Sequence, residues 1–199
     1  PNLPPISRRR PATGEVIKMV GATPVFCDIY ASTFNIDPSK LKKSLEFAKS
    51  IHLKPKAIMP VDLFGLPARY RLIKEFAIEN NLVIIEDAAQ SFGASKDNKK
   101  IGTFSDITTT SFFPAKPLGC YGDGGAIFTD SDQINAKLRS LAVHGQGIDK
   151  YDNIQIGMNS RLDTLQAAIL LEKLSIFPEE IELRNTVANI YRERFNELN

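Results

Sequence analysis

Residues 111–125 read Ser-Phe-Phe-Pro-Ala-Lys-Pro-Leu-Gly-Cys-Tyr-Gly-Asp-Gly-Gly, and this stretch decides how the rest of the chain is interpreted. It joins two predicted strands, at residues 107–113 and 126–129, through a loop with one lysine, Lys116, between two prolines. The prolines stiffen the backbone around this lysine, and the four glycines let other groups approach it closely. An amine held in this way suits covalent attachment of an aldehyde cofactor. The ordinary alternative for a single lysine is a solvated loop side chain.

Short strands and helices alternate along the rest of the chain. The clearest strand is Leu-Val-Ile-Ile-Glu at residues 82–86, an apolar run typical of a strand buried on both faces of a parallel sheet. Two more strands are predicted at residues 23–28 and 56–63. Helices are predicted at residues 12–20, 38–47, 131–141, 162–176 and 178–198, and from the break at Gly65 and Pro67 to about Asn80. This order predicts a three-layer α/β domain with a mostly parallel sheet, in which ligands bind at the carboxyl ends of the strands.

Several side chains mark the starts and buried faces of these helices. Asp37 is predicted to be an N-cap with Pro38 at the first helical position, and Ser131 or Asp132 to cap a later helix. The helix that ends near Asn80 has a predicted buried stripe, which consists of Leu72, Ile73, Phe76 and Ala77. Residues 144–160 are polar and glycine-rich, which predicts a loop.

The composition excludes several classes of protein. The chain has 199 residues, of which 43% are hydrophobic and 24% charged, and its net charge of +2 gives no reason to expect nucleic acid or membrane partners. Two scattered cysteines favour a reducing compartment, so we expect a cytoplasmic protein. Two histidines without a Cys/His cluster predict no metal site. There is no signal peptide and no initiator methionine, so we expect a piece of a longer protein.

Asp87 follows the strand at residues 82–86 directly, at its carboxyl end. A carboxylate at this point can pair with a protonated ring nitrogen, as a pyridoxal phosphate enzyme requires. The alternative is an aspartate that caps the next helix.

Lys116 must be unprotonated to attack an aldehyde, and the same amine can carry a proton between substrate and cofactor in a transaminase. Ser111, five residues earlier, has a hydroxyl that can bind phosphate, or it is an ordinary strand residue. The run Gly-Cys-Tyr-Gly-Asp-Gly-Gly that follows lacks the spacing of a dinucleotide-binding motif and leads into a strand, so we interpret it as a tight turn.

Four motifs in the same order give the chain a resemblance to the nucleotide-sugar aminotransferases, a pyridoxal phosphate-dependent branch of the aspartate aminotransferase fold. They are Glu-Asp-Ala-Ala-Gln at residues 86–90, Thr-Ser-Phe-Phe-Pro-Ala-Lys-Pro-Leu-Gly at 110–119, Gly-Asp-Gly-Gly-Ala at 122–126 and Gly-Met-Asn-Ser-Arg-Leu-Asp at 157–163. Within this branch, the residues of these motifs most resemble the group that aminates C3 of UDP-2-acetamido-2-deoxy-3-oxo-glucuronate. That group uses glutamate as the donor and makes sugars for O-antigen and lipopolysaccharide.

The resemblance implies cofactor roles for four residues. Lys116 is implied to be the Schiff-base lysine and Asp87 the partner of the pyridine nitrogen. Gln90 is implied to contact the cofactor near its phenolic oxygen, and Ser111 to bind its phosphate. The alternative for Gln90 is a glutamine on a helix surface.

Two later residues are implied to act at the edge of the site. Asn159 is expected to reach the phosphate of a neighbouring subunit, which implies a homodimer with shared active sites, and its alternative is a turn asparagine. Arg161 is implied to lie near the substrate, with a helix N-terminal arginine as the alternative.

The resemblance divides the chain into an atypical segment, residues 1–11, and a pyridoxal phosphate-binding large domain, residues 12–199, without the family's first phosphate-binding turn and small C-terminal domain. The aromatic that stacks on the pyridine ring would align with Arg10, which does not fit the family. The implied function is transfer of an amino group from glutamate to a UDP-linked keto sugar. The alternatives are another nucleotide-linked keto sugar, aminated at C3 or C4, a non-catalytic fragment that keeps only the dimerisation surface, and a related dehydratase, which Lys116 disfavours because those enzymes have histidine there.

Overall fold

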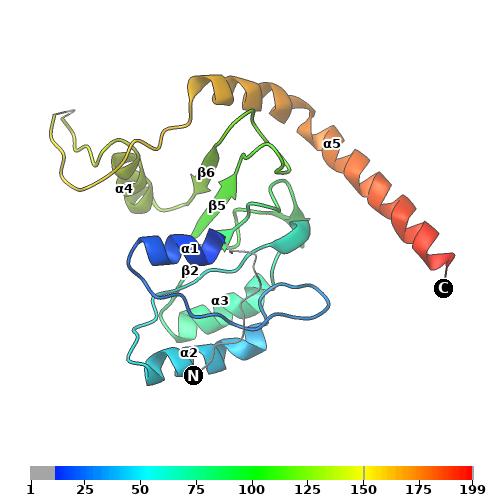
Figure 1. The fold of residues 1–199 in the computed structure, drawn as a ribbon, viewed down its shortest axis with the longest axis horizontal. Helices are drawn as coiled ribbons and strands as arrows, with labels where there is room; N and C mark the ends of the chain where they lie inside the picture. Colours follow the sequence, from blue (N-terminus) through cyan, green and yellow to red (C-terminus); the bar gives the residue numbers. More distant parts are fainter. Residues whose placement is uncertain (1–11, 150, 199) are drawn as a thin grey trace.

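A four-stranded, mostly parallel sheet forms the centre of the protein (Figure 1). The computed structural model describes residues 12–149 and 151–198. The strands are β1 (Ala57–Ile58), β2 (Val83–Asp87), β5 (Ile107–Ser111) and β6 (Gly125–Phe128), in the spatial order β1-β2-β5-β6. The first three are parallel, and β6 runs antiparallel to β5 because it returns directly from the lysine loop. A small antiparallel hairpin pairs β3 (Ser95–Lys96) with β4 (Lys99–Lys100).

Helices connect and flank these strands. Their bounds are α1 (Ala12–Met19), η1 (Pro38–Lys40), α2 (Leu41–Ser50), η2 (Leu63–Gly65), α3 (Tyr70–Glu79), α4 (Asp132–Ala142) and α5 (Thr164–Asn196). The predicted caps are confirmed: the Asp37 side chain accepts from the amide of Ser39, and Ser131 accepts from the amide of Ile134. No helix in the described ranges is both long and apolar enough to cross a bilayer.

The helices lie on both faces of the sheet. Ile84 of β2 packs in one core cluster with Ile73 and Ala77 of α3, as the predicted helix stripe requires. Asp87, on the opposite face of the same strand, accepts a hydrogen bond from Thr13 of α1. Since side chains alternate along a strand, α3 and α1 cover opposite faces, which gives three layers.

The predicted strand at residues 23–28 is wrong. This segment pairs with no strand in the described part of the chain, and its nearest ladder contact is an isolated antiparallel bridge between Ile29 and Ile36. Phe26 in this segment is 60% exposed. An apolar stretch becomes a strand only where another strand satisfies its backbone groups. The predicted strand at residues 56–63 is likewise reduced to β1 and one bridge from Val61 to Asp87.

The apolar run of β2 is buried on one face only, whereas the sequence predicted a strand buried on both faces. Ile84 and Glu86 are buried, whereas Val83 is 43% exposed and Ile85 is half-buried. On the second face, α1 contacts β2 through the hydrogen bond from Thr13 to Asp87.

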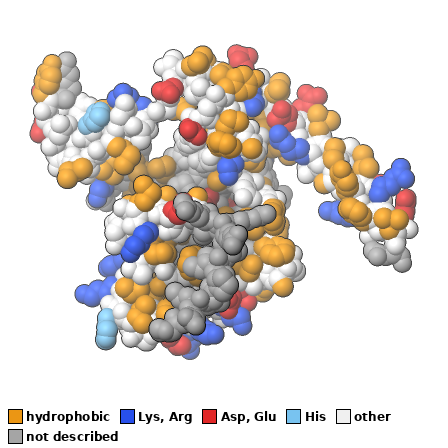
Figure 2. Space-filling view, in the orientation of Figure 1, with side chains coloured by type: hydrophobic (Ala, Val, Ile, Leu, Met, Phe, Trp, Pro, Cys, Tyr) orange, Lys and Arg blue, Asp and Glu red, His pale blue; other side chains and the backbone are white. Residues whose placement is uncertain are grey.

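The two C-terminal helices predicted from the sequence form one element, α5, with Pro178 inside it. Proline removes one backbone donor and disturbs one turn, so it can bend a helix without ending it. Figure 1 shows the bend, after which the second half projects away from the sheet. Apolar side chains lie exposed along this projecting half (Figure 2), including Leu183, Val187 and Ile190, which are 52–58% exposed.

Candidate functional site

The carboxyl ends of β2 and β5 meet at one edge of the sheet. Asp87 is in register with Thr109, so β5 continues two residues beyond it before the lysine loop begins. The loop after β2 is held to β5 by the amide of Ala88, which donates to the carbonyl of Thr109 at 2.8 Å. The hydroxyl of Thr110 donates back to the carbonyl of Ala88 at 3.3 Å. The two loops that carry the predicted site residues therefore leave the sheet side by side.

Asp87 is held in place through both its backbone and its side chain. Its amide donates to the carbonyl of Pro60 at 2.9 Å, and its carbonyl accepts from the amide of Asp62 at 3.0 Å. Its Oδ2 accepts from Thr13 Oγ1 at 2.7 Å, and its Oδ1 accepts from the amide of Ala89 at 3.2 Å. Residues 89–93 form turns, so Asp87 caps no helix and that alternative is removed. The sequence analysis did not identify Thr13 as a partner of Asp87, because the two residues are 74 positions apart and no local pattern connects them.

The loop that contains Lys116 is closed on itself by backbone hydrogen bonds. The amide of Lys116 donates to the carbonyl of Phe113 at 2.8 Å, and the amide of Cys120 donates to the carbonyl of Phe112 at 2.8 Å. The Cys120 thiol is buried and lies 3.0 Å from the same carbonyl. Lys116 itself is half-buried. A short, closed loop of this kind fixes where the lysine side chain starts.

Helix α5 supports this loop from outside. Gln166 Oε1 accepts from the amide of Tyr121 at 2.9 Å, and Lys173 Nζ donates to the carbonyl of Gly119. The Lys173 ammonium also lies 5.7 Å from the centre of the Tyr121 ring, within the range of a cation–π contact. The charge pattern of the helix did not reveal these contacts, because each joins residues more than forty positions apart.

Replacing Gly119 with alanine is expected to destabilise the protein by about 1–3 kcal/mol, because the added carbon overpacks a closed loop. A β-carbon at this position would lie 2.5 Å from the carbonyl oxygen of Pro114 and 2.8 Å from that of Phe113, both backbone atoms of the loop. Urea unfolding measures the loss. Gly122→Ala is the matched control, since its nearest neighbour would be the end of the flexible Gln166 side chain at 3.2 Å. Equal losses for the two variants would contradict the explanation.

Ser111 and Gln90 both lie at the same edge of the sheet. Ser111 ends β5, is half-buried, and accepts from the amide of Phe113 at 3.2 Å through its hydroxyl oxygen. Gln90 lies in the turn after Asp87, not on a helix. Its Oε1 accepts from the amide of Phe64 at 2.9 Å, a residue with a positive φ of 58°, which is strained for a bulky side chain. Gln90 therefore braces a strained turn with its oxygen.

Asn159 and Arg161 lie on a separate part of the chain and are both exposed. Asn159 forms an isolated bridge with Val143, which ties the end of the loop back to α4. Figure 1 shows the intervening loop projecting sideways beside α4, away from the sheet. The predicted roles of the two residues, toward a neighbouring subunit and toward the substrate, stay predictions.

Two buried carboxyl groups, those of Asp62 and Glu86, lie next to Asp87, and the sequence analysis did not identify them as candidate site residues. Asp62 and Glu86 are both fully buried. Burial raises the pKa of Glu86 to about 7, and the negative charge of Asp62 adds to this effect against hydrogen bonds from Thr108 and Ser105. Burial also raises the pKa of Asp62, against the hydrogen bonds that it accepts from Ala68, Tyr70 and Ser91. The signal in the sequence was polar residues within otherwise apolar strands.

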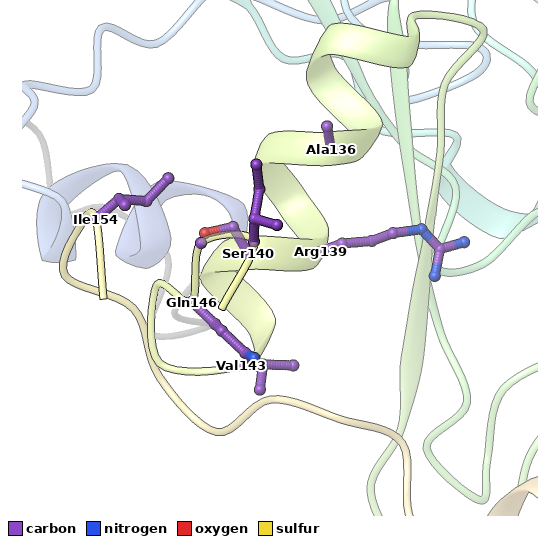
Figure 3. Close-up of a pocket in the computed structure, with 8 residues that line it drawn as sticks. Ala136, Arg139, Ser140, Val143, Gln146 and Ile154 are labelled. Carbon is purple, nitrogen blue, oxygen red and sulfur yellow. The ribbon is translucent and has the colours of Figure 1, made fainter. Parts of the chain in front are cut away.

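A shallow, open pocket lies elsewhere, between α4 and the following loop (Figure 3). It has a volume of about 490 Å³ and is lined by residues that include Arg139, Ser140, Val143 and Gln146. None of the predicted cofactor residues lines it. This pocket is therefore separate from the candidate site at the carboxyl edge of the sheet.

Two further expectations concern what surrounds the site. Within residues 12–149 and 151–198, no group of three or more His, Cys, Asp or Glu side chains could hold a metal ion. The position expected to carry a ring-stacking aromatic, Arg10, lies outside the described residues, as does all of the atypical segment 1–11.

Comparison with known sequences identifies the family of the chain. The DegT/DnrJ/EryC1/StrS aminotransferase family matches residues 10–199. The UDP-2-acetamido-2-deoxy-3-oxo-D-glucuronate aminotransferase of Pseudomonas aeruginosa is 51% identical over 180 residues, which cover 90% of this chain and 48% of that protein. A pleiotropic regulatory protein of Geobacillus stearothermophilus is 42% identical over 186 residues and covers 94% and 48%. The chain thus spans about half the length of these relatives.

Solved structures agree with this placement and confirm the predicted fold class. A DegT DnrJ EryC1 StrS aminotransferase from Brucella abortus superimposes with a TM-score of 0.91 at 50% identity, covering 94% of this chain and 50% of that one. NtdA from Bacillus subtilis, solved with bound cofactor PMP, superimposes with a TM-score of 0.74 at 35% identity, covering 83% and 36%. The chain belongs to the DegT/DnrJ/EryC1/StrS aminotransferase family.

Proposed function

We propose that this chain contributes the cofactor-binding part of a pyridoxal phosphate-dependent aminotransferase, which moves an amino group from glutamate to C3 of UDP-2-acetamido-2-deoxy-3-oxo-glucuronate. The observation that carries the proposal is the meeting of the Asp87 turn and the Lys116 loop at one carboxyl edge. The similarity to the Pseudomonas aeruginosa enzyme supports the choice of sugar. A cytoplasmic location fits the free thiols of Cys27 and Cys120.

The side chains at this edge suit pyridoxal phosphate. Asp87 accepts two hydrogen bonds within the chain, from Thr13 and Ala89, and a carboxylate has about four acceptor positions. One carboxylate oxygen can therefore still accept from a protonated ring nitrogen. Ser111 keeps its hydroxyl proton free to donate to a phosphate oxygen, because the hydrogen bond from Phe113 uses only its oxygen.

Each residue then has a defined task. When bound, the cofactor supplies an electron-withdrawing ring that stabilises negative charge on a substrate carbon. Asp87 keeps the ring nitrogen protonated by holding a negative charge beside it. Lys116 would hold the cofactor through a covalent bond to its side-chain nitrogen, and when released its amine would take a proton from one carbon and return it to another. Gln90 keeps its amide N–H groups free to donate, since its oxygen is already used by Phe64.

A second copy of the chain is the proposed partner. Asn159 is exposed on a loop that projects beside α4, which suits a residue that completes a site in a neighbour. The exposed apolar side chains of α5 form the kind of surface that is buried in an interface. Arg161 is exposed and lies three residues before the start of α5. It is proposed to face the negatively charged nucleotide sugar.

Amino transfer from glutamate tests the proposed function directly. The purified protein, incubated with pyridoxal phosphate, is expected to gain a coenzyme absorbance band, which glutamate shifts. Addition of the UDP-linked 3-keto sugar should restore the band and release an aminated sugar, detected by mass spectrometry. Keto sugars linked to dTDP or GDP are the controls for the nucleotide. A protein without a coenzyme band and without transfer, but dimeric in solution, would instead be the non-catalytic pairing module.

A further inference from the structure

Asp62 and Glu86 lie on the same face of two neighbouring segments, because Val61 and Asp87 form a parallel bridge and side chains alternate along each segment. The negative charge of Asp62 accordingly raises the pKa of the Glu86 carboxyl group. Asp62 follows β1, and Glu86 is in β2, on the opposite face from Asp87. Both side chains are fully buried, so neither can be solvated by bulk water. Two ionised carboxylates in contact in such a place would repel each other strongly.

The hydrogen bonds around the pair show where a proton belongs. Asp62 Oδ1 accepts from the amide of Ala68 and from the hydroxyl of Tyr70, both at 2.8 Å. Asp62 Oδ2 accepts from Ser91 Oγ at 3.0 Å. A carboxyl group whose two oxygens accept three hydrogen bonds is suited to the ionised form, so Asp62 is the carboxylate of the pair.

Glu86 has a different environment at each of its two oxygens. Oε2 accepts from Ser105 Oγ and Thr108 Oγ1, both at 2.9 Å. Oε1 is the buried side-chain atom without a partner in the described part of the chain. A buried polar atom left without a partner is costly, and a proton on Oε1 would turn it into a donor toward the neighbouring carboxylate.

We propose that Glu86 carries a proton on Oε1 and shares it with the Asp62 carboxylate, and that this acid pair is a positioning device for Asp87. The pair joins β2 to the segment after β1 at the point where the backbone of Asp87 is held between Pro60 and Asp62. Asp62 also reaches Ser91, beyond Asp87 in the chain. The acid pair therefore braces the turn on both sides of Asp87 without touching its carboxylate.

The charged groups that surround the pair are few. Tyr70 faces Asp62 from α3, and burial beside two carboxyl groups raises the pKa of its phenol, so it remains a donor. The Lys96 ammonium donates to the carbonyls of Pro67 and Ala68 and not to the acids. In the described ranges, no lysine, arginine or histidine forms an ion pair with either carboxylate. A proton is therefore the one positive charge shared between them.

A shared proton makes stability depend on pH in a defined direction. The pKa of Glu86 is raised from the usual value of 4.5 to about 7 in the folded protein. Below pH 4.5 both the folded and the unfolded states hold the proton, and the stabilisation is fully present. Between pH 4.5 and 7 the folded protein binds one more proton than the unfolded chain, so stability falls as pH rises.

Urea unfolding of the full chain and of Glu86→Gln between pH 5 and 7 tests the proton directly. A glutamine amide donates to Asp62 as the protonated acid does, but it does not titrate. Relative to Glu86→Gln, the unfolding equilibrium constant of the wild type is expected to rise by up to about tenfold per pH unit. Glu75→Gln, which removes an exposed carboxylate on α3, is the matched control and keeps the wild-type slope. Parallel profiles for wild type and Glu86→Gln would overturn the shared proton.

Infrared spectroscopy provides a second measurement that does not depend on how well Glu86→Gln folds. At pH 6 the wild type is expected to show the carbonyl stretch of one protonated carboxylic acid, which disappears at pH 9. Asp62→Asn should lower the pH at which this band disappears, because the negative charge of Asp62 then no longer adds to the effect of burial on Glu86. Glu75→Gln should leave that pH unchanged. A wild type without the band, or the same midpoint pH in Asp62→Asn as in the wild type, would contradict the proposal.

The role of the Asp62–Glu86 pair in positioning Asp87 rests on the proposed function. The affinity for pyridoxal phosphate measures this role separately. Glu86→Gln is expected to bind the cofactor within about twofold of wild type, whereas Glu86→Ala, which cannot bridge to Asp62, should bind at least tenfold more weakly. Wild-type affinity in Glu86→Ala would overturn the positioning role. If the wild type itself binds no cofactor, the proposed function fails, while the pH profile and the infrared band still decide whether the proton is shared.

Discussion

Lys116→Ala is expected to lower the rate of glutamate-dependent amino transfer by on the order of 10⁴-fold, the upper end of what a positioned acid–base group contributes. Lys116 is the half-buried amine of a closed loop, and no other lysine lies between residues 101 and 136. The variant loses both the covalent anchor and the group that moves the proton. Lys116→Arg should be equally inactive, because a guanidinium keeps its charge but cannot lose the proton that blocks attack.

Borohydride reduction identifies the anchored residue independently of the rate. In the wild type loaded with pyridoxal phosphate, reduction should attach the cofactor to Lys116, as peptide mass spectrometry would detect. Lys137→Ala, on the exposed face of α4, is the control and should retain both label and activity. A label that persists in Lys116→Ala, or on another lysine of the wild type, would disprove the assignment.

Asp87→Ala is expected to lower the rate by about 10²–10³-fold, the usual effect of removing one group that stabilises developing charge in a buried site. Asp87→Asn is the sharper variant. Asparagine can keep contacts with both Thr13 and Ala89, since the Thr13 hydroxyl can reverse its hydrogen bond, so the loop should stay in place. Only the negative charge is lost, and we expect most of the rate to be lost with it.

Steady-state rates and an absorbance titration with pyridoxal phosphate separate the loss of turnover in Asp87→Asn from any loss of cofactor binding. The rate with saturating cofactor should remain low in Asp87→Asn, since the protonation of the ring nitrogen and not the occupancy of the site is affected. Asp97→Asn is the matched control, because Asp97 is exposed in a turn with a φ of 51° that asparagine tolerates. Wild-type turnover in Asp87→Asn would show that this carboxylate is not the partner of the ring.

Local patterns predicted the elements that carry the site. The apolar run at residues 82–86 and the Thr-rich run at residues 107–113 both become strands, β2 and β5. Because Asp87 ends β2 and Lys116 lies in the loop after β5, their common edge could be expected from the rule for parallel sheets. Their chemical roles came from the resemblance of the motifs, which local structure alone does not supply.

Predictions that needed a partner segment failed. Residues 23–28 have the composition of a strand but gain no ladder, and α5 continues through Pro178 where two helices were expected. A strand needs a neighbouring strand for its backbone groups, and a local stretch of sequence does not contain that neighbour. The helix continues because proline removes one backbone donor and disturbs one turn, which bends a helix without ending it.

The sequence by itself determined the α/β class and the two strands that lead to Asp87 and to the loop of Lys116, because short-range periodicity and motif spacing are local properties. Only the tertiary structure decided what holds them. Thr13 reaches Asp87 across 74 positions, Lys173 supports the lysine loop across 54, and Asp62 meets Ser91 across 29. Hydrogen bonds and buried charges act over a few ångströms in space, whatever the separation along the chain, so the fold and not the local sequence brings these partners to Asp87 and to the loop of Lys116.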